Sequence, residues 1–87
     1  MYCIIVYDVE QKRVNKVCKF LRKYLFWIQN SVFEGEVKES DFLKIKNGIE
    51  KLINKKKDSI IIFSFGRPKW IKREIIGIER GDISQFI

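Results

Sequence analysis

Residues 2–8 read YCIIVYD, a continuous apolar run that ends in the carboxylate of Asp8. The β-branched and aromatic content of this run, together with its length, predicts a strand. Because polar and apolar residues do not alternate in it, we expect both faces of the strand to be buried. Residues 59–65, SIIIFSF, have the same character and predict another strand that is apolar on both faces.

Two amphipathic helices are predicted between these strands. The first covers residues 11–25, where apolar side chains recur at helical spacing; they are Val14, Val17, Cys18, Leu21 and Leu25. The second begins at Glu39-Ser40-Asp41, because acids and a capping hydroxyl stabilise a helix N-terminus. Its apolar stripe consists of Phe42, Ile45, Ile49, Leu52 and Ile53.

Shorter β-rich runs complete the pattern. Phe26–Gln29 and residues 32–37 flank Asn30-Ser31, a pair that favours a tight hairpin turn. Residues 74–79, EIIGIE, predict one extra strand. The order β-α-β-β-α-β with an extra C-terminal strand predicts a ferredoxin-like fold of the α+β class, a single domain over residues 1–87. In this fold both helices cover one face of an antiparallel sheet, and the first and third strands lie at its centre.

The other face of this sheet has no helix to cover it. Two of its strands are nevertheless apolar on both faces, and a large apolar patch is not tolerated on a monomer without partners. We therefore expect a homodimer packed sheet to sheet about a two-fold axis. The extra strand at about 74–79 could cover a sheet edge of its own chain or of the partner subunit, and we expect it to pair with the partner. The alternative is a monomer whose C-terminal tail folds back over its own sheet.

The composition limits the chemistry. The chain has 18 Lys and Arg against 11 Asp and Glu, a net charge of +7, and no histidine. This excess favours a polyanionic partner, usually nucleic acid, over a lysine-rich surface that meets only solvent. The lack of histidine excludes Ser-His-Asp and Cys-His catalysis, and Cys3 and Cys18 do not form a zinc-binding pair.

The sequence suggests neither export nor a membrane. Asp8 and Glu10 interrupt the N-terminal apolar run too early for a signal peptide. No apolar run reaches the roughly 20 residues that span a bilayer. Two scattered cysteines on apolar segments suggest buried, reduced thiols. We therefore expect a cytoplasmic protein with no membrane partner.

Basic side chains gather in two places. On the first helix they form a cationic ridge suited to phosphate contacts, and its members are Lys12, Arg13, Lys16, Lys19, Arg22 and Lys23. The alternative is an ordinary solvated helix face. A second cluster, Arg67, Lys69, Lys72 and Arg73, surrounds Trp70. An aromatic ring among cations could stack on a base, although a packing or interface role is the commoner one.

Asp8 admits two interpretations. At the end of a strand and before a helix, an aspartate is most often a turn former or a cap. In the expected dimer, a two-fold axis near this strand end would bring two copies of Asp8 together, and a cation would relieve their repulsion. Magnesium prefers oxygen ligands and keeps several waters, so one carboxylate from each subunit could hold it.

Three features together resemble the Cas2 family of CRISPR-associated proteins. They are the strand that ends in Tyr7-Asp8-Val9, the basic helix that opens near Arg13, and residues 29–35, QNSVFEG, which resemble the family signature Q-x-S-V-F-E. Trp27 stands where the family often has an arginine. Carried over by position, the family motif residues are Tyr7, Asp8, Arg13, Gln29, Ser31 and Phe33.

The resemblance implies a role in CRISPR adaptation. It implies a homodimer with exchanged terminal strands that holds duplex DNA beside the integrase subunit during spacer acquisition. It also implies a Mg²⁺-dependent endonuclease that acts on RNA or DNA, with Asp8 as catalytic residue and metal ligand. Two alternatives stay open: a structural DNA-bridging adaptor without catalysis, and a toxin-like RNA-cleaving dimer.

Overall fold

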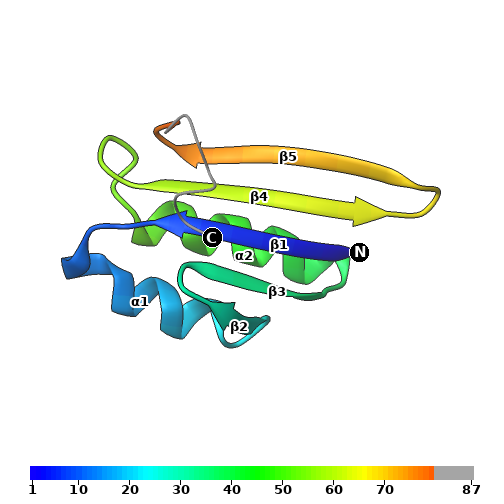
Figure 1. The fold of residues 1–87 in the computed structure, drawn as a ribbon, viewed down its shortest axis with the longest axis horizontal. Coiled ribbons are helices and arrows are strands. Elements are labelled where there is room, and N and C mark those ends of the chain that lie inside the picture. The colour runs from blue at the N-terminus through cyan, green and yellow to red at the C-terminus, as the bar shows by residue number, and fades with distance from the viewer. Residues whose placement is uncertain (80–87) are drawn as a thin grey trace.

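The structure, a computed structural model, describes residues 1–79. Their five strands form one antiparallel sheet of order β2-β3-β1-β4-β5, and both helices lie behind this sheet in Figure 1. The elements in chain order are β1 (Tyr2–Asp8), α1 (Gln11–Leu21), β2 (Phe26–Gln29), β3 (Val32–Glu36), α2 (Glu39–Leu52), β4 (Ser59–Gly66) and β5 (Trp70–Gly77). The predicted ferredoxin-like α+β fold with an extra strand is confirmed.

The main core lies between the sheet and the helices. Cys3 and Ile5 of β1 pack there with Ile60 and Ile62 of β4. The helices contribute fully or largely buried side chains to the same cluster, namely Val17, Leu21, Phe42, Ile45 and Ile49. Burial raises the pKa of the Cys3 thiol to about 11, so this thiol stays protonated at neutral pH and is no nucleophile.

A second, smaller apolar cluster lies on the face of the sheet that carries no helix. Side chains of successive strand residues point to opposite faces, so Ile4 and Val6 of β1 face away from Cys3 and Ile5. The cluster consists of the buried Val6, Val32 and Ile61 and of the partly buried Ile4, Phe63 and Ile75. We call it the helix-free cluster. As the sequence indicates, β1 and β4 are apolar on both faces.

One predicted helix boundary and one predicted helix cap need correction. Helix α1 ends at Leu21 rather than Leu25, and Leu25 reaches the core from the turn that follows. At the start of α2, Lys38 occupies the N-cap position and makes no side-chain capping bond, so Ser40 is not the cap. The acids of that segment do lie in the first turn of α2, where they suit the helix dipole.

The extra strand also differs from its prediction. It runs from Trp70 to Gly77 rather than over 74–79, and it pairs along its whole length with β4 of the same chain. A tight turn through residues 67–69 joins the two strands, so a hairpin forms before any partner is needed. One edge of this strand therefore meets its own chain, and β5 is the edge strand of the sheet, so pairing of its other edge with a partner subunit stays a prediction. The alternative of a folded-back tail concerns residues 80–87, which lie outside the described residues.

Candidate functional site

Asp8 is the last residue of β1 and pairs with Ser59 of β4. Counting along the strand by twos, it lies on the same face as Ile4 and Val6, at the end of the helix-free cluster. Its side chain is half-buried. The carboxylate thus stands beside the apolar surface on which a second copy is expected.

The family motif residues gather near Asp8, mainly on the other face of the sheet. Tyr7 is buried in the main core, where its hydroxyl accepts a bond from the Cys18 thiol and donates one to the Asn30 carbonyl, both at 3.3 Å. Its ring centroid lies 5.8 Å from that of the fully buried Phe33. The Tyr7 amide donates to the Ser31 carbonyl at 3.0 Å. These contacts hold the β2–β3 turn beside the end of β1.

Asn30 explains why that turn is tight. Its φ is +44°, in the left-handed region that asparagine tolerates better than most residues. Gln29, the first residue of the motif, is exposed on β2. The predicted hairpin turn is confirmed, and within the motif Tyr7 and Phe33 serve the core.

A buried ion pair lies on the helix side of the same strand ends. The Asp58 side chain is fully buried, and the Arg13 guanidinium donates to its two oxygens at 2.6 and 2.9 Å. The carboxylate also accepts from the amides of Glu10 at 3.0 Å and Asn54 at 2.8 Å. The Arg13 hydrogen bond, assisted by these two amides, holds the pKa of the Asp58 carboxyl well below its usual range.

Arg13 therefore corrects the predicted ridge. Its side chain is only 17% exposed and also pairs with Glu10, so two carboxylates occupy the guanidinium. Sequence reasoning missed Asp58, whose only signal is an acid standing between three lysines and an apolar strand. The Asp58–Arg13 pair ties the β1–α1 loop to the start of β4, and this loop follows Asp8 directly.

The rest of the cationic ridge is at the surface. Its five remaining members, Lys12, Lys16, Lys19, Arg22 and Lys23, are all exposed. None of the five forms a salt bridge with any residue in the part of the chain that the structure describes. The ridge lies on the helix side of the sheet and Asp8 on the other side. The structure thus does not bring the two onto one face, although Lys12 stands in the first turn of α1, near the Asp8 end.

The donor set around Asp8 can be tested against magnesium. Within residues 1–79, no group of three or more Cys, Asp or Glu side chains is close enough to hold a metal ion. Magnesium is commonly bound by one or two carboxylates and otherwise keeps its waters. By that standard the Asp8 carboxylate fits magnesium, and a second copy packed on the helix-free cluster would add a second carboxylate.

Comparisons with known proteins give a consistent result. The family model described as CRISPR associated protein Cas2 matches residues 1–73. The chain is 53% identical over its full length to a CRISPR-associated endoribonuclease Cas2 of Methanocaldococcus jannaschii, covering 76% of that relative. It is 48% identical to one of Dictyoglomus turgidum, with full coverage of both chains. A crystal structure of Streptococcus pyogenes Cas2 superposes with a TM-score of 0.70 at 34% identity, over 78% of this chain and 89% of that one. None of the helices among the described residues is long and apolar enough to cross a membrane.

Proposed function

The chain belongs to the CRISPR-associated Cas2 family, and we propose that it is a homodimeric, Mg²⁺-dependent endonuclease that binds nucleic acid during CRISPR adaptation. The observation that carries the proposal is the position of Asp8 at the end of the helix-free cluster. A second copy packed on that cluster would face this Asp8 with its own.

The chemistry follows from the two carboxylates. At close range they repel, and a divalent cation between them would relieve this repulsion. Bound there, magnesium would activate a water and polarise a phosphodiester. The protein's part is to fix the geometry: the Asp58–Arg13 pair anchors the loop after Asp8, and the Tyr7 contacts anchor the strand before it.

The positive charge of the exposed ridge supports a nucleic acid as the substrate. The five exposed cations of the ridge lie on α1 and just after its end, and contacts of this kind bind phosphates without reading sequence. The relatives named as endoribonucleases support RNA as the cleaved substrate. We further propose that the same surface holds duplex DNA beside the integrase subunit during spacer acquisition.

A nuclease assay tests the catalytic part. Purified protein should cleave RNA in magnesium and stop in a chelator, and Asp8→Asn should lower the rate by about 100-fold or more. Asp41→Asn, an exchange in the first turn of α2, is the matched control and should leave the rate unchanged. Cleavage that survives in Asp8→Asn or in chelator would contradict the proposal and would point to a contaminating nuclease.

One observation favours a second function. The five exposed cations of the ridge lie on the helix side of the sheet and Asp8 lies on the other side, so a dimer that holds DNA without cutting it is the alternative. This structural adaptor would bind duplex DNA with equal affinity in the wild type and in Asp8→Asn. Neither protein would cleave any substrate in magnesium.

A further inference from the structure

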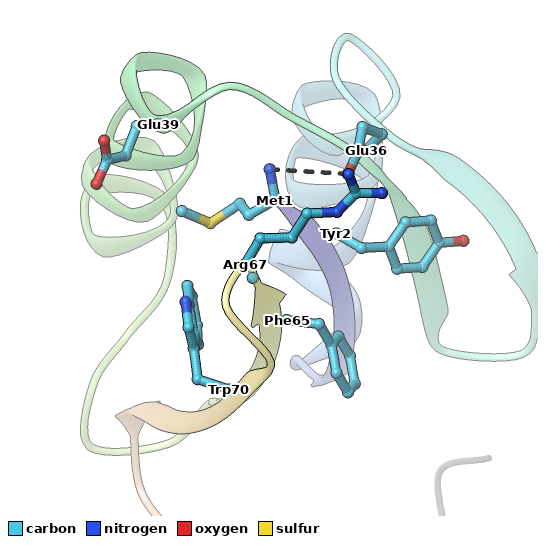
Figure 2. Close-up of a pocket in the computed structure, with 8 residues that line it drawn as sticks. Met1, Tyr2, Glu36, Glu39, Phe65, Arg67 and Trp70 are labelled. Carbon is cyan, nitrogen blue, oxygen red and sulfur yellow. Dashed lines mark ion pairs between the residues drawn. The ribbon is translucent and has the colours of Figure 1, made fainter.

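A pocket opens at the end of the sheet where β1 begins, far along the strand from Asp8. Its volume is about 840 Å³, a size that suits a ligand as large as a nucleotide. Figure 2 shows Trp70 on one side, Phe65 and Tyr2 on the other, and the Arg67 side chain extending away from Trp70 toward the side of Glu36. The lining residues are Met1, Tyr2, Glu36, Glu39, Phe65, Gly66, Arg67 and Trp70.

Trp70 is held as a flat platform. Its indole lies so close to Gly66 that a Cβ atom added there would come within 2.1 Å of the ring. The side chain is still 39% exposed. One part of the ring thus rests on the backbone while the remainder is open to a ligand, and holding it this way spares the cost of ordering it on binding.

The proposed sheet-to-sheet dimer does not explain this exposed tryptophan. In β5, Trp70 shares a face with Ile76, which packs in the main core, and with Glu74, which pairs with Lys46 of α2 at 2.7 Å. Trp70 is therefore on the helix side. Its neighbour Ile71, 73% exposed, is on the opposite side with the helix-free cluster.

The charged side chains around the pocket differ from one side to the other. Arg67, Lys69 and Lys72 are exposed around the β4–β5 turn, and none of them forms a salt bridge within residues 1–79. The acids Glu36 and Glu39 lie across the pocket, where Glu36 is 3.7 Å from the Met1 ammonium (Figure 2). Phosphates are thus favoured at the turn beside Lys69 and Lys72 and disfavoured at the acidic far rim.

We propose that this pocket binds one unpaired nucleotide of a single-stranded nucleic acid. The base stacks on Trp70, and Arg67 and Lys69 hold the adjoining phosphates. Proteins that bind single strands without sequence preference commonly combine an aromatic side chain with exposed cations, because every base has a flat face that can stack. The proposal rests on the proposed function only in requiring nucleic-acid binding, and it uses neither Asp8 nor the cationic ridge.

The two tryptophans allow a direct test. Trp27 lies on β2 at one edge of the sheet and Trp70 on β5 at the other, and both are exposed. In Trp27→Phe the only indole is Trp70, and a titration with oligothymidylate should quench its emission to saturation. A duplex of the same length should quench it much less, because its base faces are stacked. In Trp70→Phe, the remaining Trp27 emission should change little.

Affinity gives a second measurement. Trp70→Ala should weaken binding of labelled oligothymidylate about 5- to 100-fold and leave duplex binding unchanged. Gly66→Ala, which displaces the indole, should act in the same direction, while Trp70→Phe should keep part of the affinity. Trp27→Ala is the matched control and should bind like the wild type.

Three results would overturn the pocket proposal. In Trp27→Phe, the Trp70 emission could stay unchanged although the labelled oligonucleotide binds. Alternatively, Trp70→Ala could bind the labelled oligonucleotide with wild-type affinity. Trp70 emission could also shift to the blue as protein concentration rises without nucleic acid, which would assign the pocket to a contact between copies. If Lys16→Gln with Lys19→Gln still weakens duplex binding, only the pocket proposal fails. If wild type binds no nucleic acid, the proposed function fails with it.

Discussion

The two ends of β1 use similar residue types in opposite ways. Where β1 stops, an arginine and an aspartate meet out of solvent: Arg13 is 17% exposed and Asp58 is fully buried. Where β1 starts, Arg67 and Trp70 stay at the surface around a pocket. The first set holds the chain together, and the second remains available to a ligand. Burial and ion-pair partners, more than residue type, distinguish a charged side chain that stabilises the fold from one that is available to bind a ligand.

Removing Asp58 should have the largest effect on this contrast. Asp58→Ala leaves the Arg13 guanidinium partly buried without its main partner, and breaking a buried pair costs about 3–5 kcal/mol of unfolding free energy. Urea denaturation measures the loss. Glu50→Gln, at the exposed Lys55–Glu50 pair, is the control and should cost under about 1 kcal/mol. Equal losses of unfolding free energy in the two variants would show that the buried pair stabilises the fold no more than the exposed pair does.

Low pH should reduce the stability that the Asp58–Arg13 pair contributes. Because the pKa of the Asp58 carboxyl is lower in the folded than in the unfolded chain, its contribution is present above the unfolded value of about 3.9 and is lost as pH falls below it. Denaturation midpoints between pH 7 and pH 2 should therefore fall less steeply in Asp58→Asn than in the wild type. Parallel curves would contradict the assignment.

Gly77 should give an intermediate effect. Its φ of +95° is unfavourable for other residues, and a Cβ there would lie 2.1 Å from the Asp58 carbonyl oxygen. Gly77→Ala should cost about 1–3 kcal/mol by urea denaturation. Gly35→Ala, where the added carbon meets the flexible end of Leu25 at 3.1 Å, should cost less. The reverse order would mean that the end of β5 adapts easily.

The exposed cations should affect binding and leave stability nearly unchanged. Lys16→Gln with Lys19→Gln should lower the slope of duplex affinity against salt by about 2, because each lost phosphate contact removes about 0.9. Lys55→Gln with Lys56→Gln, in the turn between α2 and β4, is the matched control for net charge. Identical slopes for the two double variants would show that charge alone, and not the ridge, determines binding.

The sequence predicts the fold well because the strands of this protein carry strong patterns. The runs ending at Asp8 and Phe65 are apolar on both faces, and this places them inside the sheet and leaves a face for a partner. The start of β5 is harder to predict, because Trp70 and Ile71 favour a strand but the adjoining cations Lys69, Lys72 and Arg73 do not. Pairing with β4 overrides that local preference.

Site residues are predicted only where the signal is local. The position of Asp8 follows from its strand, whereas the role predicted for it rests on the family resemblance. The exposed ridge follows from the spacing of its lysines and arginines. The role of Arg13 could not be predicted, because its partner Asp58 is 45 residues away in the chain. The platform at Trp70 likewise depends on Gly66 across a turn, a contact that no periodicity encodes.

The most direct measurement is the RNA cleavage rate of a mixed dimer of one wild-type and one Asp8→Asn chain. This dimer is purified through a different tag on each chain. Because the proposed site takes one Asp8 from each copy, this dimer should cleave RNA as slowly as the Asp8→Asn homodimer. Retention of about half the wild-type rate would contradict the shared site, because each chain would then act alone. Failure of the two chains to copurify would contradict the dimer itself.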